Sequence, residues 1–196
     1  PLKTEVDIPH VENHNIVTLF CPHTLKKNVL VQLVAIALLQ RIHNIVLHTN
    51  IPVDPRFAER IGLKFAAHPW MQREEYDKLI ASSKLNFAVS IAETLNYQVA
   101  EAALLGTASV VSEAISWLRE EIVEANMVIF PIVHNSNNPL EISEVASEVL
   151  REGSKYGMYS LSAGTRARLA ALRYFEHANT EARFALSRLI LADSPT

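Results

Sequence analysis

The stretch "SIAETLNYQVAEAALLGTASVVSEA", residues 90–114, decides the fold and raises the question of function. The apolar run that leads into it, residues 85–91, has the composition of a buried β-strand. Residues 96–105 then have the pattern of a helix that runs into Gly106, and residues 108–112 form another short β-branched run. A strand, a helix and a strand in this order indicate a βαβ unit with parallel strands.

The same alternation runs through the rest of the chain. Apolar, β-branched runs predict further strands at residues 15–21, 44–49, 62–68 and 127–131. Helical patterns predict helices at residues 27–40, 54–60, 72–83, 117–125, 139–151, 162–177 and 180–191. We therefore predict an α/β fold with a doubly wound, parallel, six-stranded sheet and extra C-terminal helices. The predicted division is a lead-in at 1–14, the sheet domain at 15–152 and C-terminal helices at 153–196.

Composition excludes several classes of protein. The chain has 196 residues, 49% hydrophobic and 20% charged, with a formal net charge of −3 at pH 7. This is typical of a folded globular protein, and the charge gives no bias towards nucleic acid or anionic membranes. The longest apolar run is too short to span a bilayer, no signal peptide is visible, and the single Cys21 excludes an internal disulfide. We therefore expect a cytoplasmic protein without a nucleic-acid partner or a transmembrane segment.

The glycines exclude the usual phosphate-binding loops. There are five, and none has the GxGxxG or GxxxxGK[ST] spacing. If the chain binds a phosphate group, helix N-termini and lysines must therefore hold it.

Two glutamates lie where a parallel sheet binds its ligands, beyond the carboxyl ends of the strands. Glu93 falls in the turn after the strand at 85–91, and Glu101 lies on the helix that follows. Thr94 or Asn96 is expected to cap that helix. Carboxylates on a turn and on a helix accept hydrogen bonds from two sets of hydroxyls of one elongated ligand, such as a sugar joined to a ribose through phosphates.

The alternative gives these glutamates no ligand. Glu93 would then be only a charge near a helix N-terminus, and Glu101 a residue on an exposed helix face. The alanines around Glu101, in "VAEAA", count against the exposed face because they indicate a buried environment.

Two lysines point to an anionic ligand. Lys26 and Lys27 follow the first predicted strand, at the start of the first predicted helix, where positive charge opposes the helix dipole. The alternative is two solvated lysines. His23 is a further candidate beside them, and His68, after the third strand, faces the crevice in this layout unless it only serves the turn. The pair of histidines in "HVENH", residues 10–14, lacks the order and setting of a metal site, so we predict no metal.

These residues resemble a known family. "ETLNYQVAE", Glu93 to Glu101, is similar to the Glu-x7-Glu signature of the C-terminal, donor-binding domain of retaining GT-B glycosyltransferases, the group that includes sucrose and glycogen synthase-like enzymes. "EAALLGTASVVS" is similar to the run that follows in this family, and "HPWMQREEYDKLIASSKLNFAVS" to the segment that precedes it. "PHTLKKN" lies where these enzymes place a lysine against the donor diphosphate. The resemblance covers roughly residues 15–152.

The resemblance implies a Rossmann-like nucleotide-sugar-binding domain and a hexosyltransferase that retains the anomeric configuration. The donor would be a UDP- or GDP-linked sugar, and the acceptor is unknown. The acceptor half would be an N-terminal GT-B domain supplied by the rest of a parent protein, so this chain alone is expected to bind donor but to transfer poorly. No metal or other cofactor is required in this scheme.

The resemblance also implies roles for single residues. Glu93 would accept hydrogen bonds from the donor sugar, Glu101 would hold the ribose hydroxyls, and Lys27, or else Lys26, would neutralise the diphosphate and so stabilise the leaving group. Backbone amides around three residues would assist, namely Leu95, Asn96 and Tyr97.

The chain departs from the family pattern at two places. Thr94, Leu95 and Asn96 replace the usual glycines after the first glutamate, and asparagine is the one that tolerates a positive φ. The usual first-turn arginine is replaced by the sequence "CPH", for which His23 or Arg73 would substitute. These departures leave two alternatives open: a non-catalytic module of this fold that binds a nucleotide or a partner protein, and a doubly wound domain with an unrelated ligand.

Overall fold

The computed structural model describes residues 15–22, 24–93, 96–115 and 132–156, and within them it contains one six-stranded, all-parallel sheet. The strand order is β3-β2-β1-β4-β5-β6. The strands are β1 Ile16–Leu19, β2 Val46–Thr49, β3 Phe65–Ala67, β4 Leu85–Ala88, β5 Ser109–Ser112 and β6 Ile132–Val133. This is the order of a doubly wound, Rossmann-like sheet, so the predicted fold class is confirmed.

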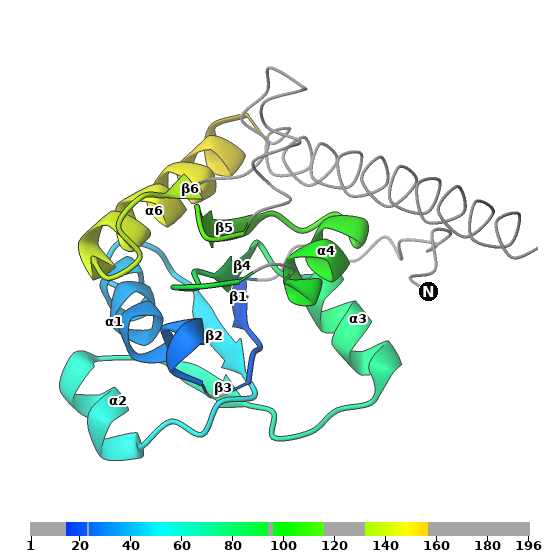
Figure 1. Cartoon of the computed structure of the whole chain (residues 1–196), viewed down its shortest axis with the longest axis horizontal. Helices are drawn as coiled ribbons and strands as arrows, with labels where there is room; N and C mark the ends of the chain where they lie inside the picture. The colour runs from blue at the N-terminus through cyan, green and yellow to red at the C-terminus, as the bar shows by residue number, and fades with distance from the viewer. Residues whose placement is uncertain (1–14, 23, 94–95, 116–131, 157–196) are drawn as a thin grey trace, which may run out of the picture.

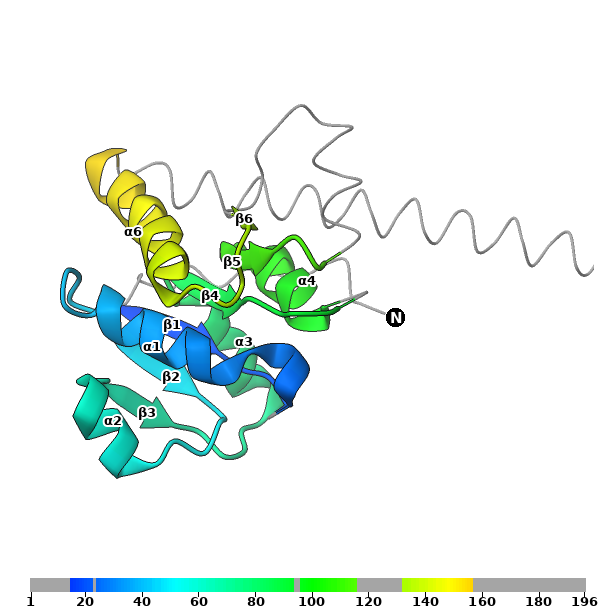
Figure 2. The same ribbon diagram turned by 60° about the vertical axis from the view of Figure 1, so that its left-hand side comes forward.

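Helices cover both faces of the sheet (Figure 1). They are the short 3-10 helix η1 Leu25–Lys27, α1 Val29–Leu39, α2 Pro55–Ile61, α3 Arg73–Ala81, α4 Tyr97–Leu104 and α6 Pro139–Tyr156. α1, α2 and α6 lie on one side, and α3 and α4 lie on the other (Figures 1 and 2). α6 packs directly on α1, so the last described helix returns to the side of the first.

Burial explains the composition of the central elements. Every residue of β4 and β5 is buried, since helices lie over both faces of these strands. α1 buries seven of its eleven residues because it packs on the sheet and on α6, whereas Leu30 on its outer side is 61% exposed. α3, by contrast, is amphipathic and is closed at its start by a capping box between Gln72 and Glu75.

A buried polar ladder crosses the middle of the sheet. Asn86 on β4 accepts a hydrogen bond from Thr18 on β1 (3.2 Å) and donates one to Ser109 on β5 (2.9 Å). Gln98 on α4 donates a further bond to Asn86 (2.7 Å). Thr18, Asn86 and Ser109 are fully buried, so these bonds satisfy polar groups that water cannot reach. The bond from Gln98 also holds α4 against the sheet.

Several element boundaries were predicted from single residues. Asp54 caps α2 as expected, since its side chain accepts the Arg56 amide at 2.8 Å, and Pro55 is the first helical residue. The left-handed Gly62 (φ 73°) ends the helix. α6 begins at Pro139 as predicted and runs on to Tyr156, beyond the expected end at 151.

The start of the first long helix differs from the prediction. Lys26 and Lys27 belong to the separate η1, and α1 begins only at Val29. The cause is Asn28, which lies in the left-handed region at φ 50° and breaks the helix, while its side-chain amide donates to the carbonyl of Ser136. The lysines therefore lie on a tight turn before the helix.

Other predicted segments fall partly or wholly outside the described residues. β6 begins at Ile132, directly after the strand predicted at 127–131, which is outside them. The lead-in at 1–14 and the helices predicted at 117–125, 162–177 and 180–191 lie outside them as well. None of the helices in the described ranges is long and apolar enough to cross a membrane.

Candidate functional site

The loops after β1 and β4 meet where the strand order reverses. β1 and β4 are neighbours in the sheet, but β1 leads towards β2 and β4 leads towards β5. The Ile91 amide after β4 donates to the Lys26 carbonyl after β1 at 2.8 Å, which holds the two loops together. A crevice at such a reversal is the usual ligand site of this class of sheet.

Gln32 fixes both loops from below. Its side-chain amide donates to the Lys27 carbonyl at 2.7 Å, and its side-chain oxygen accepts the Val89 amide at 2.9 Å. The residue is 1% exposed, so these bonds replace water for two buried backbone groups. The position of Lys27 therefore depends on a side chain one turn into α1.

Lys27 and Glu93 form an ion pair between the loop after β1 and the loop after β4. Their side chains are only 16% and 18% exposed. Glu93 also forms a parallel bridge with Ile115, which ties the loop after β4 to the residues after β5. The pair thus lies between two held backbones, and it brings together the two residues that the sequence indicated for the sugar and the diphosphate.

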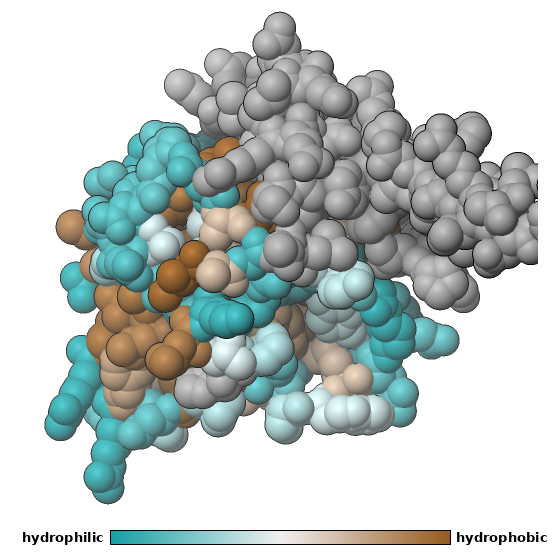
Figure 3. Space-filling model, in the orientation of Figure 1, coloured by the Kyte–Doolittle hydropathy of each residue, from teal (hydrophilic) through white to brown (hydrophobic). Residues whose placement is uncertain are grey.

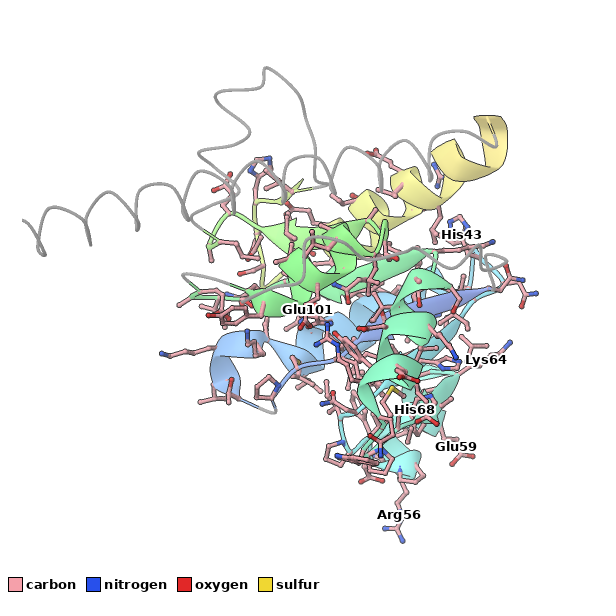
Figure 4. The ribbon with its side chains drawn as sticks, turned by 90° about the vertical axis from the view of Figure 1, so that its right-hand side faces the viewer. His43, Arg56, Glu59, Lys64, His68 and Glu101 are labelled. Atoms are coloured by element: carbon pink, nitrogen blue, oxygen red, sulfur yellow. The ribbon has the colours of Figure 1, made fainter. Side chains whose placement is uncertain are left out.

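Glu101 is held by two residues of α3. Arg73 Nη1 donates to Glu101 Oε1 at 2.7 Å, and the Tyr76 hydroxyl donates to Oε2 at 3.4 Å. The Glu101 side chain is 19% exposed, which contradicts the alternative of an exposed helix face. Figure 4 shows Glu101 beside the first turn of α3.

Arg73 is fixed by further contacts. Its Nε lies 2.9 Å from Asp77 Oδ1 and 3.1 Å from Oδ2, and its guanidinium carbon lies 5.6 Å from the centroid of the Tyr76 ring. Burial alone would lower the pKa of Arg73, but the hydrogen bonds and charges of Glu101 and Asp77 outweigh it and raise that pKa above its ordinary value. Burial and the Glu101 charge likewise raise the pKa of Tyr76, so its hydroxyl remains a donor.

Sequence reasoning named Arg73 for another role and did not single out Tyr76. Arg73 was one of two candidates, with His23, to replace a missing phosphate-binding arginine, whereas the structure pairs Arg73 with Glu101. The available signal was the spacing: positions 73, 76 and 77 are three and four residues apart and share one face of the first turns of α3. Nothing in the sequence alone placed that face against Glu101.

Aromatic rings back this part of the crevice. Phe20 meets the Tyr76 ring edge to face at 5.5 Å between centroids, and lies 6.3 Å from the His68 ring. His68 stacks on His48 at 4.9 Å, with ring nitrogens 2.9 Å apart. Burial and then the charge of His68 lower the pKa of His48. Sequence reasoning placed His68 at the crevice, and the structure places it at the β3 end of it, bonded to a neighbouring histidine (Figure 4).

The remaining predicted residues are spread over the rim. Lys26 is exposed, and Tyr97 is 62% exposed at the start of α4. Asn96 is buried at the N-cap position, but its side chain makes no cap hydrogen bond and its φ is −96°, so it neither caps by side chain nor supplies the expected positive φ. His23, Thr94 and Leu95 lie outside the described residues.

Two further loops complete the rim. After β5 and β6, Glu113 Oε1 lies 2.5 Å from His134 Nδ1. Glu141, in the first turn of α6, accepts the backbone amides of His134 (2.7 Å) and Asn135 (3.1 Å), which orders the loop before that helix. In the described ranges no three acidic, histidine or cysteine side chains gather closely enough to hold a metal ion.

Cys21 is not poised as a nucleophile. Burial raises the pKa of its thiol to about 11, although the charge of Lys27 acts in the opposite direction. Its backbone amide donates to the Asn50 side chain at 3.1 Å. The residue is therefore a small half-buried side chain in the first turn.

An apolar depression lies beside the charged crevice. It runs between α1, α2 and the loop after β2, where Figure 3 shows apolar side chains gathered over α1. Its lining residues are Val29, Leu30, Leu33, Ile51, Pro52, Val53, Asp54 and Phe57. Asp54, the only charged member, already caps α2, so this depression offers no cation for a phosphate. The charged crevice is the better candidate for a nucleotide.

Known structures decide the fold. A trehalose-6-phosphate synthase structure from E. coli, bound with UDP-2-fluoro glucose, superposes with a TM-score of 0.66 at 12% identity over 83% of this chain. TarM gives a TM-score of 0.68 at 16% identity over 94% of the chain. The chain has the fold of a GT-B glycosyltransferase domain. A sucrose-phosphate synthase from Thermosynechococcus elongatus agrees, with a TM-score of 0.61 at 16% identity over 98% of the chain.

The GT-B likeness is one of structure. No protein-family model matches the sequence, and no curated protein matches it either. The chain spans 41% of the trehalose-6-phosphate synthase, 37% of TarM and 47% of the sucrose-phosphate synthase. It therefore corresponds to less than half of these longer chains.

Proposed function

We propose that this chain is the donor-binding half of a retaining glycosyltransferase that transfers a hexose from a nucleotide-diphosphate sugar. The observation that carries the proposal is the pair of part-buried carboxylates, Glu93 and Glu101, each facing a cation at the mouth of a GT-B domain. Such a carboxylate has acceptor sites left over, and the hydroxyls of a sugar and of a ribose fit them.

Lys27 has two partners in this proposal. The structure pairs it with Glu93. A donor would bring a diphosphate to the same place, and Lys27 would then share its donors between phosphate and carboxylate, since an ammonium group has three. Glu93, released in part, would accept hydrogen bonds from the sugar. The leaving nucleoside diphosphate develops negative charge, and the positive charge of Lys27 beside it would stabilise that departure.

The N-terminus of α4 would supply a second group that binds the diphosphate. The helix starts at Tyr97, after the loop that carries Glu93, so its N-terminal amides face the same end of the sheet. Asn96, Tyr97 and the neighbouring Leu95 would assist diphosphate binding through the backbone. Transfer itself would need an acceptor-binding N-terminal domain, in keeping with the longer chains of the GT-B neighbours.

A second function is favoured by one feature of the first turn. The "CPHTLKK" sequence offers lysines but no arginine, and Arg73 is engaged by Glu101 and Asp77. Weak diphosphate binding of this kind would suit a non-catalytic module that binds a nucleotide or a partner protein.

Calorimetry on the full chain distinguishes the two. We expect UDP- or GDP-linked sugar to bind, and Lys27→Ala and Glu101→Ala each to weaken binding by roughly 10- to 100-fold, since a hydrogen bond to a charged group is worth about 1.5–3 kcal/mol. Lys64→Ala is the matched control, because this exposed lysine precedes β3 at the opposite end of the sheet (Figure 4).

Two outcomes would count against the proposal. Absence of binding with UDP-, GDP- and ADP-sugars alike would favour a module for a partner protein. Binding that ignores both substitutions would place the nucleotide elsewhere.

A further inference from the structure

One arginine is clamped between two carboxylates beside the proposed ribose site. Arg73 gives its Nε to Asp77 and its Nη1 to Glu101, at 2.9–3.1 Å and 2.7 Å. Asp77 lies one turn further along the same helix, whereas Glu101 lies on α4. The guanidinium is therefore a rigid link from the helix that carries Arg73 to a carboxylate on another helix.

The two ion pairs of Arg73 fix the orientation of its guanidinium group. A guanidinium is planar and its donors have fixed angles, so holding Nε also sets where Nη1 points. The guanidinium also lies over the Tyr76 ring, with its carbon 5.6 Å from the ring centroid, a cation–π contact that favours the same placement. A lysine at this position would supply the charge without the fixed angle.

Glu101 keeps acceptor sites free in this arrangement. Each of its oxygens receives one donor, Nη1 of Arg73 on Oε1 and the Tyr76 hydroxyl on Oε2. A carboxylate has about four acceptor sites. Since the side chain is 19% exposed, it is not fully enclosed, and two acceptor sites remain for a ligand. Two accessible acceptors on one carboxylate match the paired hydroxyls of a ribose.

We propose that Arg73 is a positioning residue, which aims the Glu101 carboxylate at the 2′- and 3′-hydroxyls of the donor nucleotide. This inference rests on the proposed function. Arg73 acts through Glu101 and needs no contact with the ligand. Arg73 carries one positive charge against the carboxylates of Glu101 and Asp77, so it offsets part of their negative charge.

The test compares a nucleotide with its analogue that lacks the two hydroxyls. Calorimetry on the full chain would use UDP and GDP, each beside its 2′,3′-dideoxy form. For the wild type we expect the ribonucleotide to bind about tenfold more tightly. In Arg73→Ala this ratio should fall to near one, as in Glu101→Ala, and the double variant should lose nothing further. Arg73→Lys should restore only a small preference for the ribonucleotide, below about threefold. Lysine keeps the positive charge but lacks the planar, two-pronged arrangement of donors.

A matched control separates this from a general charge effect. Arg56→Ala removes the same charge from an exposed position on α2, away from Glu101 (Figure 4), and should leave the ratio at its wild-type value. Thermal unfolding of each variant identifies a folding defect, and Arg73→Lys provides the folded alternative if the alanine variant is unstable.

The outcomes distinguish this inference from the proposed function. A wild-type ratio that survives Arg73→Ala, with binding still weakened by Lys27→Ala, overturns the positioning role and leaves the proposed function intact. Equal weakening of both nucleotides by Arg73→Ala also overturns it, because Arg73 would then act on the base or the phosphates. If neither UDP nor GDP binds the wild type, the proposed function fails and the positioning role fails with it.

Discussion

Replacing Gln32 by methionine should destabilise the domain far more than the same change at Gln40. Both side chains bridge a backbone pair. Gln32 bonds the Lys27 carbonyl (2.7 Å) and the Val89 amide (2.9 Å), and Gln40 bonds the carbonyl (2.7 Å) and the amide (2.8 Å) of Lys64. Gln32 is 1% exposed, whereas Gln40 makes its bonds at the surface. Methionine is unbranched and similar in length, so it creates no large cavity.

The magnitude follows from what is left unpaired. A buried polar group without a partner costs about 1–3 kcal/mol, so two such groups at Gln32 should cost about 2–5 kcal/mol. At Gln40 water replaces the lost partners, and we expect a loss of about 1 kcal/mol or less. For a domain of this size the Gln32 variant should unfold roughly 5–15 °C lower.

Urea unfolding and thermal unfolding, both followed by circular dichroism, measure the difference. An unchanged urea m-value would show that the two variants unfold from states of similar compactness. The two substitutions can be compared directly when their effects differ by more than about 0.5 kcal/mol, the usual scatter for independent sites. If they lower the free energy of unfolding by amounts closer than that, burial is not what makes the Gln32 bridge important. Gln32→Met should also weaken nucleotide binding, because it releases the loop that carries Lys27.

Two further predictions concern titrating groups. Because burial raises the pKa of Cys21 to about 11, a thiol reagent should react slowly at pH 7 and faster with each pH unit up to that value; a rate already at its plateau by pH 8 would contradict it. Burial, and then neighbouring positive charge, lowers the pKa of both His43 and His48 below 6.5 in the folded chain. Below about pH 6.5 these two histidines therefore bind more protons in the unfolded chain than in the folded chain. Their contribution to stability should be complete above that pH and should decrease as the pH falls below it. Replacing both histidines by glutamine should reduce this slope, and an unchanged slope in urea titrations at pH 5–7 would assign it to other groups.

The sequence predicted the fold well because its signals are local. The run at residues 85–91 and the run at 108–112 are apolar because both faces of β4 and β5 are covered, and that burial is visible in composition. Asp54 with Pro55 predicted the start of α2, since a cap is an interaction between residues two apart. The parallel, doubly wound arrangement was predicted from the alternation of strands and helices.

The errors arise where tertiary contacts decide the backbone. Asn28 turns left-handed in a setting where its side chain reaches Ser136, which is 108 residues away in the chain, so no window around Lys27 indicated the break before α1. Asn96, the residue expected to adopt a positive φ, has a φ of −96° in the structure. The Glu101 partners were missed for the same reason: Arg73 and Tyr76 are adjacent to it only because α3 packs beside α4.

Internal neutralisation explains how a chain of ordinary charge can keep two carboxylates in a part-buried crevice. An isolated Glu93 or Glu101 at below 20% exposure would pay for lost hydration, and the pairs with Lys27 and Arg73 offset this. Pairing has a consequence for binding. A ligand that only presented positive charge would have to displace a cation already in place, whereas one that presents hydroxyls and a diphosphate can add to both pairs. A phosphate group would pair with the ammonium of Lys27, and hydroxyls would donate to the unused acceptor sites of the glutamates. A ligand that is anionic at its centre and rich in hydroxyls at both ends would fit both pairs, as the nucleotide sugar proposed above would.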